Sequence, residues 1–105
     1  MSPIVLRDRD LAVLLATFRR FPVVQAVLVF GSRATGTARR ASDLDLAIAA
    51  PDASPSEWAD LCDALENAPL IYELDLVRPE RTFNSRLIEK VARDGVTIYP
   101  EPSAS

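Results

Sequence analysis

Two aspartates separated by a single residue stand within a short apolar segment of this 105-residue chain. Asp43 and Asp45 flank Leu44 in the run DLDLAIA, whose alternation predicts a strand over residues 43–49. Because side chains alternate across a strand, we expect both carboxylates on one face and Leu44 and Leu46 on the opposite face, toward the core. Neighbouring carboxylates repel unless a cation lies between them, and hard oxygen ligands suit Mg²⁺ or Mn²⁺. The pair predicts a metal site, although by itself it also fits a solvent-facing acidic strand.

A glycine and a serine precede this pair by ten residues. Gly31 and Ser32 follow the apolar run QAVLVF at residues 25–30, which predicts a buried strand. Gly31 permits a tight turn and the close approach of a ligand to the backbone. Ser32 offers a hydroxyl and, at an expected helix start, backbone N–H groups that can bind an anion, and Arg33 beside it could reach a triphosphate. A phosphate site leading into a carboxylate pair is the arrangement needed to hold a nucleoside triphosphate with its metal.

The glycine spacing also allows comparison with the Walker loop, G-x-x-x-x-G-K-[ST]. Gly31 and Gly36 match the two glycines of that motif, but Thr37 stands where the motif requires lysine. The Walker loop therefore explains this segment poorly.

Helices and strands are expected to alternate around these residues. Periodicity and capping signals predict helices over residues 8–21, after a capping box at residues 54–57, and from a Thr82 cap to Gly95. Two further strands are expected over residues 70–77 and 96–99, so the chain is an α/β domain with one sheet and helices packed on it. The inward face of the second helix is expected to carry Trp58, Leu61, Cys62 and Leu65. That of the third is expected to carry Phe83, Leu87, Ile88 and Val91.

The composition, with 49% hydrophobic and 26% charged residues, fits a single globular domain with a core over residues 8–99 and a frayed tail over residues 100–105. The net charge of −3 disfavours a nucleic-acid coat, so no direct nucleic-acid partner is expected. A lone Cys62 and the lack of histidine exclude an internal disulfide and a His-type zinc site. Charges close to Met1 and the lack of a long apolar run argue against a signal peptide or a membrane span, so we expect a cytoplasmic protein.

The combined motif, G-S followed by ten residues and D-x-D, resembles the signature of the DNA polymerase β-like nucleotidyltransferase superfamily. The longer string GSRATGTARRASDLDLAI looks most like the minimal nucleotidyltransferase (MNT) branch. The resemblance extends over residues 8–99, because a leading helix, the two motif strands, a further helix and a later strand with an aspartate follow in the same order. It implies the polymerase β-like fold, a single small mixed sheet flanked by helices.

The resemblance also implies roles for individual residues. In the superfamily, Mg²⁺ ions bridge the carboxylates and the triphosphate, so Asp43 and Asp45 are expected to hold both metals. The superfamily places a third carboxylate on a later strand, and Asp75 is the candidate here, with Glu73 a poorer rival. By the same resemblance, Asp75 completes the acceptor-side metal site and can accept the acceptor's proton.

Arginines of the segment after Gly31 are candidates for contacts with the triphosphate. Arg33 is the foremost of them, and the roles of Arg39 and Arg40 stay open. Many MNT relatives carry a second arginine where this chain has Thr35, so one phosphate or partner contact of the family is expected to be missing.

The resemblance finally implies a partner protein. Larger relatives carry an added helical domain that shapes the base and acceptor pockets, so we expect a partner or a second copy to complete the site, in a homo- or hetero-oligomer. MNT proteins are commonly paired with a helical HEPN protein, an RNase toxin. The resemblance therefore implies an antitoxin that transfers AMP from ATP to a tyrosine of that toxin. Two alternatives stay open: a non-catalytic module that masks the toxin by contact, and a nucleotidyltransferase for a small molecule.

Overall fold

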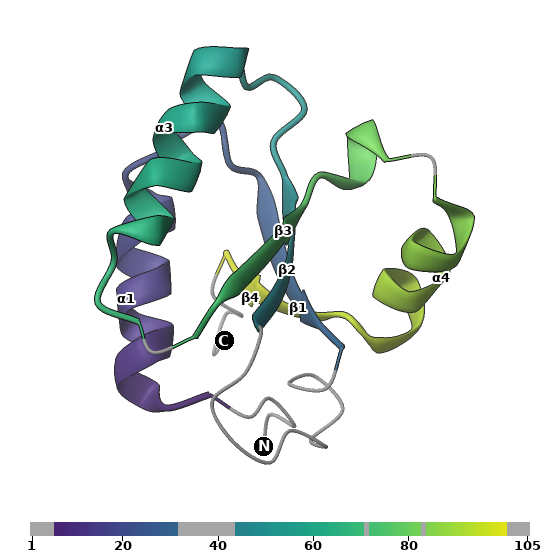
Figure 1. Cartoon of the computed structure of the whole chain (residues 1–105), viewed down its shortest axis with the longest axis horizontal. Helices are drawn as coiled ribbons and strands as arrows, with labels where there is room; N and C mark the ends of the chain where they lie inside the picture. Colours follow the sequence, from purple (N-terminus) through teal and green to yellow (C-terminus); the bar gives the residue numbers. More distant parts are fainter. Residues whose placement is uncertain (1–5, 32–43, 71, 83, 101–105) are drawn as a thin grey trace.

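A four-stranded mixed sheet lies between helices on its two faces (Figure 1). The computed structural model describes residues 6–31, 44–70, 72–82 and 84–100. The elements are α1 (Asp8–Arg19), β1 (Ala26–Phe30), β2 (Leu44–Ala49), α3 (Pro55–Glu66), β3 (Leu74–Val77), the short 3-10 helix η1 (Pro79–Arg81), α4 (Ser85–Asp94) and β4 (Val96–Tyr99). The predicted α/β class is confirmed, with α1 and α3 side by side on one face and α4 beyond the other.

The direction of the strands decides which strand ends meet. The strand order is β3-β2-β1-β4, with β1 antiparallel to both β2 and β4, and β2 parallel to β3. The end of β1 therefore lies beside the beginnings of β2 and β3, at one end of the sheet. This arrangement brings together three segments of chain that are far apart in the sequence.

The alternation of β2 separates a core face from an open face, as the sequence predicts. Leu44, Leu46 and Ile48 are completely buried beneath α1 and α3, whereas Asp45 between them points to the opposite face and is only half-buried. The same core contains residues of both helices and of β1, namely Leu14, Phe18, Val27, Val29, Leu61 and Leu65.

The capping box before α3 is confirmed. The Ser54 hydroxyl accepts the backbone N–H of Glu57 at 3.1 Å, and the Glu57 carboxylate accepts the backbone N–H of Ser54 at 2.9 Å. The box satisfies two backbone donors that a helix start would otherwise leave unpaired. Of the predicted inward face, Leu61 is completely buried, while Trp58 and Cys62 are half-buried.

Two predicted boundaries are wrong. The strand expected from residue 70 begins at Leu74, so Tyr72 lies in the approach to β3. Asn84, not Thr82, caps α4: its side chain accepts the Leu87 N–H at 3.2 Å. A 3-10 turn over Pro79–Arg81 delays the helix, and asparagine is the better cap residue.

The expected inward face of α4 is incompletely covered. The structure describes no buried residue on this helix, and the Ile88 side chain is 44% exposed. Phe83, the short helix expected after Gly31, and the tail beyond residue 100 lie outside the described residues. None of the helices in the described ranges is long and apolar enough to cross a membrane.

Candidate active site

A row of three residues crosses the sheet at the end where β1 finishes and β2 and β3 begin. The register pairs Phe30 with Asp45, and Asp45 with Asp75. Paired residues on neighbouring strands direct their side chains to the same face, and neighbouring strands lie about 4.8 Å apart. The carboxylates of Asp45 and Asp75 therefore lie side by side, on the face opposite the α1–α3 core. Asp45 is half-buried and Asp75 is exposed.

Gly31 follows Phe30 directly and lies against the carboxylate of Asp45. Its φ of +74° belongs to the left-handed region that L side chains rarely adopt. A Cβ added at this position would overlap the Oδ2 atom of Asp45 and would lie 3.3 Å from its Cγ. The sequence predicts that the missing side chain of Gly31 leaves space for a ligand. In the structure, the carboxylate of Asp45 occupies the space where a side chain would begin.

The register distinguishes the two candidates for a third carboxylate. Asp75 is the direct partner of Asp45, whereas Glu73 precedes β3 and uses its backbone carbonyl to accept the Leu44 N–H at 2.7 Å. This geometry favours Asp75 over Glu73 as the carboxylate that acts with Asp45. Two carboxylates on adjacent strands are a donor set that fits a hard divalent cation.

Several predicted site residues lie outside the described residues. These are Asp43, Ser32 and Arg33, together with Arg39 and Arg40. Within the described ranges, no group of three or more acidic, histidine or cysteine side chains is placed to hold a metal ion. The structure thus brings together Gly31, Asp45 and Asp75 from the predicted set.

An ion pair between a buried aspartate and a half-exposed arginine at the start of α1 is not evident from the sequence. Asp10, in the first turn of α1, is completely buried and accepts hydrogen bonds from Arg7 Nε at 2.8 Å and Nη2 at 3.1 Å. Tyr72, which precedes β3, also affects the ionisation of this carboxylate. The hydrogen bonds from Arg7, and to a smaller extent the interaction with Tyr72, hold the pKa of Asp10 below its ordinary value, against the opposing effect of burial.

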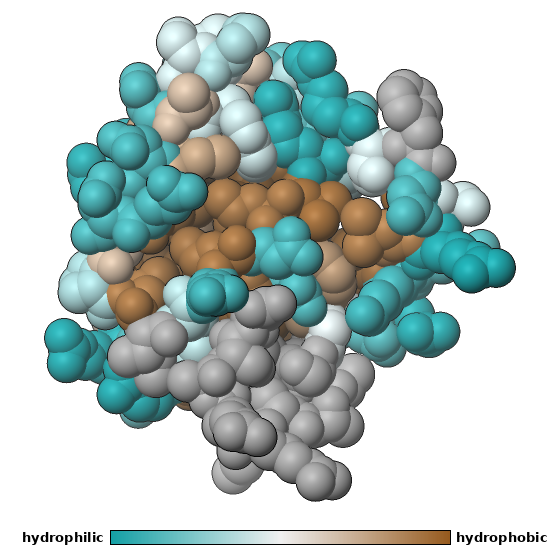
Figure 2. Space-filling model, viewed as in Figure 1, coloured by the Kyte–Doolittle hydropathy of each residue, from teal (hydrophilic) through white to brown (hydrophobic). Residues whose placement is uncertain are grey.

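Neither of two hollows in the described part of the surface is bordered by Asp45 or Asp75. One, of about 230 Å³, is apolar and is bordered by Leu28 and Val77 of the sheet and by Leu87, Ile88 and Val91 of α4. Figure 2 shows hydrophobic residues reaching across the centre of the molecule between the α1–α3 layer and α4, with hydrophilic residues among them.

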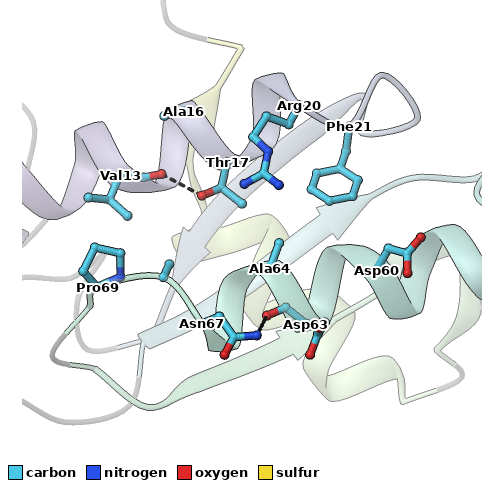
Figure 3. Close-up of a pocket in the computed structure, with 11 residues that line it drawn as sticks. Val13, Ala16, Thr17, Arg20, Phe21, Asp60, Asp63, Ala64, Asn67 and Pro69 are labelled. Carbon is cyan, nitrogen blue, oxygen red and sulfur yellow. Dashed lines mark hydrogen bonds between the residues drawn. The ribbon is translucent and has the colours of Figure 1, made fainter.

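The second hollow is an open groove of about 820 Å³ between α1 and α3. Figure 3 shows Arg20 and Phe21 of the α1 end on one side and Asp60, Asp63 and Asn67 of the α3 side on the other. The buried core separates this groove from the carboxylates. The groove therefore lies on the opposite surface of the protein from Asp45 and Asp75.

Comparison with known proteins identifies the family. The family model described as Polymerase beta, Nucleotidyltransferase matches residues 12–103, so the chain belongs to this nucleotidyltransferase family. The polymerase β-like fold expected from the sequence is thereby confirmed. No curated protein matches the chain.

Three solved structures are similar to this chain. A toxin–antitoxin complex with AMP-PNP is 26% identical, with a TM-score of 0.69 over 86% of this chain and 73% of the other. An MntA–HpeT toxin–antitoxin pair, with glutamates in place of two aspartates two positions apart, is 22% identical, with a TM-score of 0.66 over 90% and 73%. A tyrosine-to-alanine variant of that pair is 24% identical, with a TM-score of 0.65 over 88% and 71%. The last two likenesses show the shared fold alone.

Proposed function

We propose that this protein is an antitoxin that transfers AMP from Mg-ATP to a hydroxyl of a HEPN-type toxin. The observation that carries the proposal is the pairing of Asp45 with Asp75 beside Gly31, at the end of the sheet where the family motif lies. The complex with AMP-PNP among the similar structures supports a nucleotide substrate and a toxin partner.

The proposed metal site comprises three carboxylates. Asp43 and Asp45 would hold two Mg²⁺ ions, and Asp75 would complete the site on the acceptor side. When bound, the metal would lower the pKa of the acceptor hydroxyl and neutralise charge on the leaving pyrophosphate. The two carboxylates that the structure describes fit this role, because they are hard oxygen donors on adjacent strands.

The protein positions these groups by packing. Asp45 lies on an inner strand between two completely buried leucines, Leu44 and Leu46, which fix its backbone. Gly31 leaves space for its carboxylate, and the segment from Ser32 to Arg33 would bind the triphosphate. Asp75 is exposed on the edge strand, where an acceptor from another protein can reach it.

The proposed reaction has a simple atomic balance. The acceptor oxygen bonds to the α-phosphorus of ATP while its proton passes to Asp75, and the bond from that phosphorus to the bridging oxygen breaks. Pyrophosphate leaves and AMP remains on the acceptor. The contribution of the protein is positioning and stabilisation of charge.

Intact-mass measurement of the toxin tests this proposal. We expect the toxin, incubated with this protein, ATP and Mg²⁺, to gain one or more AMP units. Asp45→Asn and Asp75→Asn should lose most of this activity, whereas Asp52→Asn should retain it, because Asp52 is exposed in the turn after β2, at the far end of the sheet. Neutralisation of the toxin by both site variants without added mass would instead establish the masking module. Modification of a small alcohol but not of the toxin would establish the third alternative.

A further inference from the structure

The apolar hollow beside α4 lies on the same face of the sheet as the carboxylates. The register pairs Leu28 with Ala47, and Ala47 with Val77. This row stands two residues along the strands from the row of Asp45 and Asp75, so the side chains of both rows point to one face, and the rows are roughly 6.5 Å apart. Leu28 and Val77 border the hollow. The hollow therefore adjoins the carboxylates on the open face of the sheet.

Helix α4 and the chain before it form the other wall of this hollow, called here the α4 hollow. The residues that line this wall are Pro79, Thr82, Leu87, Ile88, Val91 and Ala92. Within the described ranges, no residue of α4 is buried, and Ile88 is the one large hydrophobic side chain that the structure leaves exposed. A concave apolar surface with an exposed apolar rim is typical of a binding site.

The size and the lining of the α4 hollow favour a benzene-type ring as its occupant. The volume is about 230 Å³, and an apolar cavity of about 150 Å³ is large enough to bind benzene. A purine base fits less well, because its ring nitrogens and amine need hydrogen-bond partners, and an unpaired polar group in an apolar site is unfavourable. Thr82 is the one polar side chain at the border of the hollow. The lining therefore favours the side chain of a phenylalanine or a tyrosine.

We propose that the α4 hollow binds an aromatic side chain of the protein that supplies the acceptor hydroxyl. The inference rests on the proposed function. A hydroxyl delivered to Asp75 brings its own protein across the face that also carries Val77, two residues further along the same strand. An aromatic side chain of that protein buries its ring between α4 and the sheet and covers the exposed rim at Ile88. Because a buried aromatic anchor fixes a partner as well as binding it, the hollow sets the position of the acceptor relative to Asp75.

N-acetyl-L-phenylalaninamide is the probe for this site, because it carries the ring and lacks an acceptor hydroxyl. We expect it to shift the methyl NMR signals of Val77, Leu87 and Ile88, whereas N-acetyl-L-alaninamide should leave them unchanged. Adenosine should shift these signals far less, because its base is polar. Unshifted signals with the phenylalanine probe would overturn the proposal. Equal or larger shifts with adenosine would also overturn it, because the hollow would then be a nucleobase site.

Two substitutions in α4 alter the hollow at exposed positions. Ala92→Leu fills it, and Ile88→Ala removes part of its wall. Because burial of an aromatic side chain strengthens binding by roughly ten- to 100-fold, both variants should bind the probe more weakly, Ala92→Leu by about that factor. Ala16→Leu is the matched control, at an exposed position of α1 that borders the groove on the opposite surface, and should keep the wild-type affinity. Wild-type affinity in both α4 variants would overturn the proposal.

Transfer to the toxin separates this inference from the proposed function. In Ala92→Leu, the KM for the toxin should rise by roughly tenfold or more, whereas the KM for ATP should change little, because the proposed triphosphate site follows β1. Ala16→Leu should keep both KM values. If the unaltered protein transfers no AMP, the proposed function fails, but the methyl shifts and the affinities of the two variants for the toxin still decide whether the α4 hollow is a docking site. Equal affinity of Ala92→Leu and Ala16→Leu for the toxin would show that it is not.

Discussion

Replacing Gly31 by alanine is expected to reduce activity far more than stability. The φ of +74° at this position makes an L residue less stable by about 1–2 kcal/mol, which for a domain of about this size lowers Tm by roughly 4–8 °C per kcal/mol. The added Cβ would overlap Asp45 Oδ2, but it would lie 3.3 Å from Cγ and 3.7 Å from Cβ of the same residue. Rotation of the carboxylate relieves the overlap without moving the strand.

Because the carboxylate of Asp45 rotates, we expect Gly31→Ala to lower kcat more than it lowers stability. A carboxylate oxygen displaced by about 1 Å from its position in the site should lower kcat by about 10²-fold. Gly31→Asn separates the two effects, because asparagine adopts the left-handed conformation more readily and still carries a Cβ. We expect Gly31→Asn to regain stability but not activity, as measured by thermal unfolding and by AMP transfer.

Gly95→Ala is the control, because it should also destabilise the protein at a glycine but lies far from the site. Gly95 has an ordinary φ of −65°, and its added Cβ would meet the Val91 carbonyl oxygen and Leu28 Cδ2. This variant should lose stability and keep kcat. If Gly31→Ala kept wild-type kcat after a Tm loss like that of Gly95→Ala, Gly31 would serve folding only, and the inference about Asp45 would be refuted.

Three further predictions concern the frame around the site. Because Arg7 holds the pKa of folded Asp10 below its ordinary value, the ionised pair stabilises the protein above about pH 4, and this contribution is lost as the pH falls through the lower folded pKa. The urea midpoint of Arg7→Met should therefore lie below that of the wild type at pH 7, and the difference should shrink in acid; a constant difference would contradict the assignment. Ser54→Ala removes one half of the capping box with Glu57, so it should lower the free energy of unfolding by about 1 kcal/mol. It should leave kcat unchanged. Burial, and secondarily the nearby Glu66 charge, raises the pKa of the Cys62 thiol, so iodoacetamide at pH 8 should modify the folded protein more slowly than the urea-unfolded chain; equal rates would show that this thiol is accessible.

The part of the fold that carries the candidate site could be predicted because its signals are local. Alternating residues in DLDLAIA define the two faces of β2, and the structure buries Leu44 and Leu46 while leaving Asp45 on the open face. The assignment of Asp75 required more than local pattern. Its pairing with Asp45 follows from the parallel register of strands that are separated by α3 in the sequence.

The supporting contacts could not be predicted because they join distant segments. Arg7 and Asp10, three residues apart at a helix start, have the spacing of an ordinary exposed helical pair. Asp10 is nevertheless completely buried, and its pKa is affected by Tyr72, which lies some sixty residues further along the chain. The amphipathic pattern of α4 predicts its inward face only in part: Leu87 and Val91 are half-buried beside the sheet, but Ile88 remains 44% exposed.

The central claim, that paired carboxylates beside Gly31 hold a metal-bound nucleotide, is tested most directly by thermal unfolding with AMP-PNP. At 100 times Kd, Mg-AMP-PNP should stabilise the wild type by about 2.7 kcal/mol. AMP-PNP with EDTA should stabilise it far less, and Asp45→Asn should show little stabilisation in either condition. Equal stabilisation of the wild type with and without Mg²⁺, or full stabilisation of Asp45→Asn by Mg-AMP-PNP, would contradict the claim.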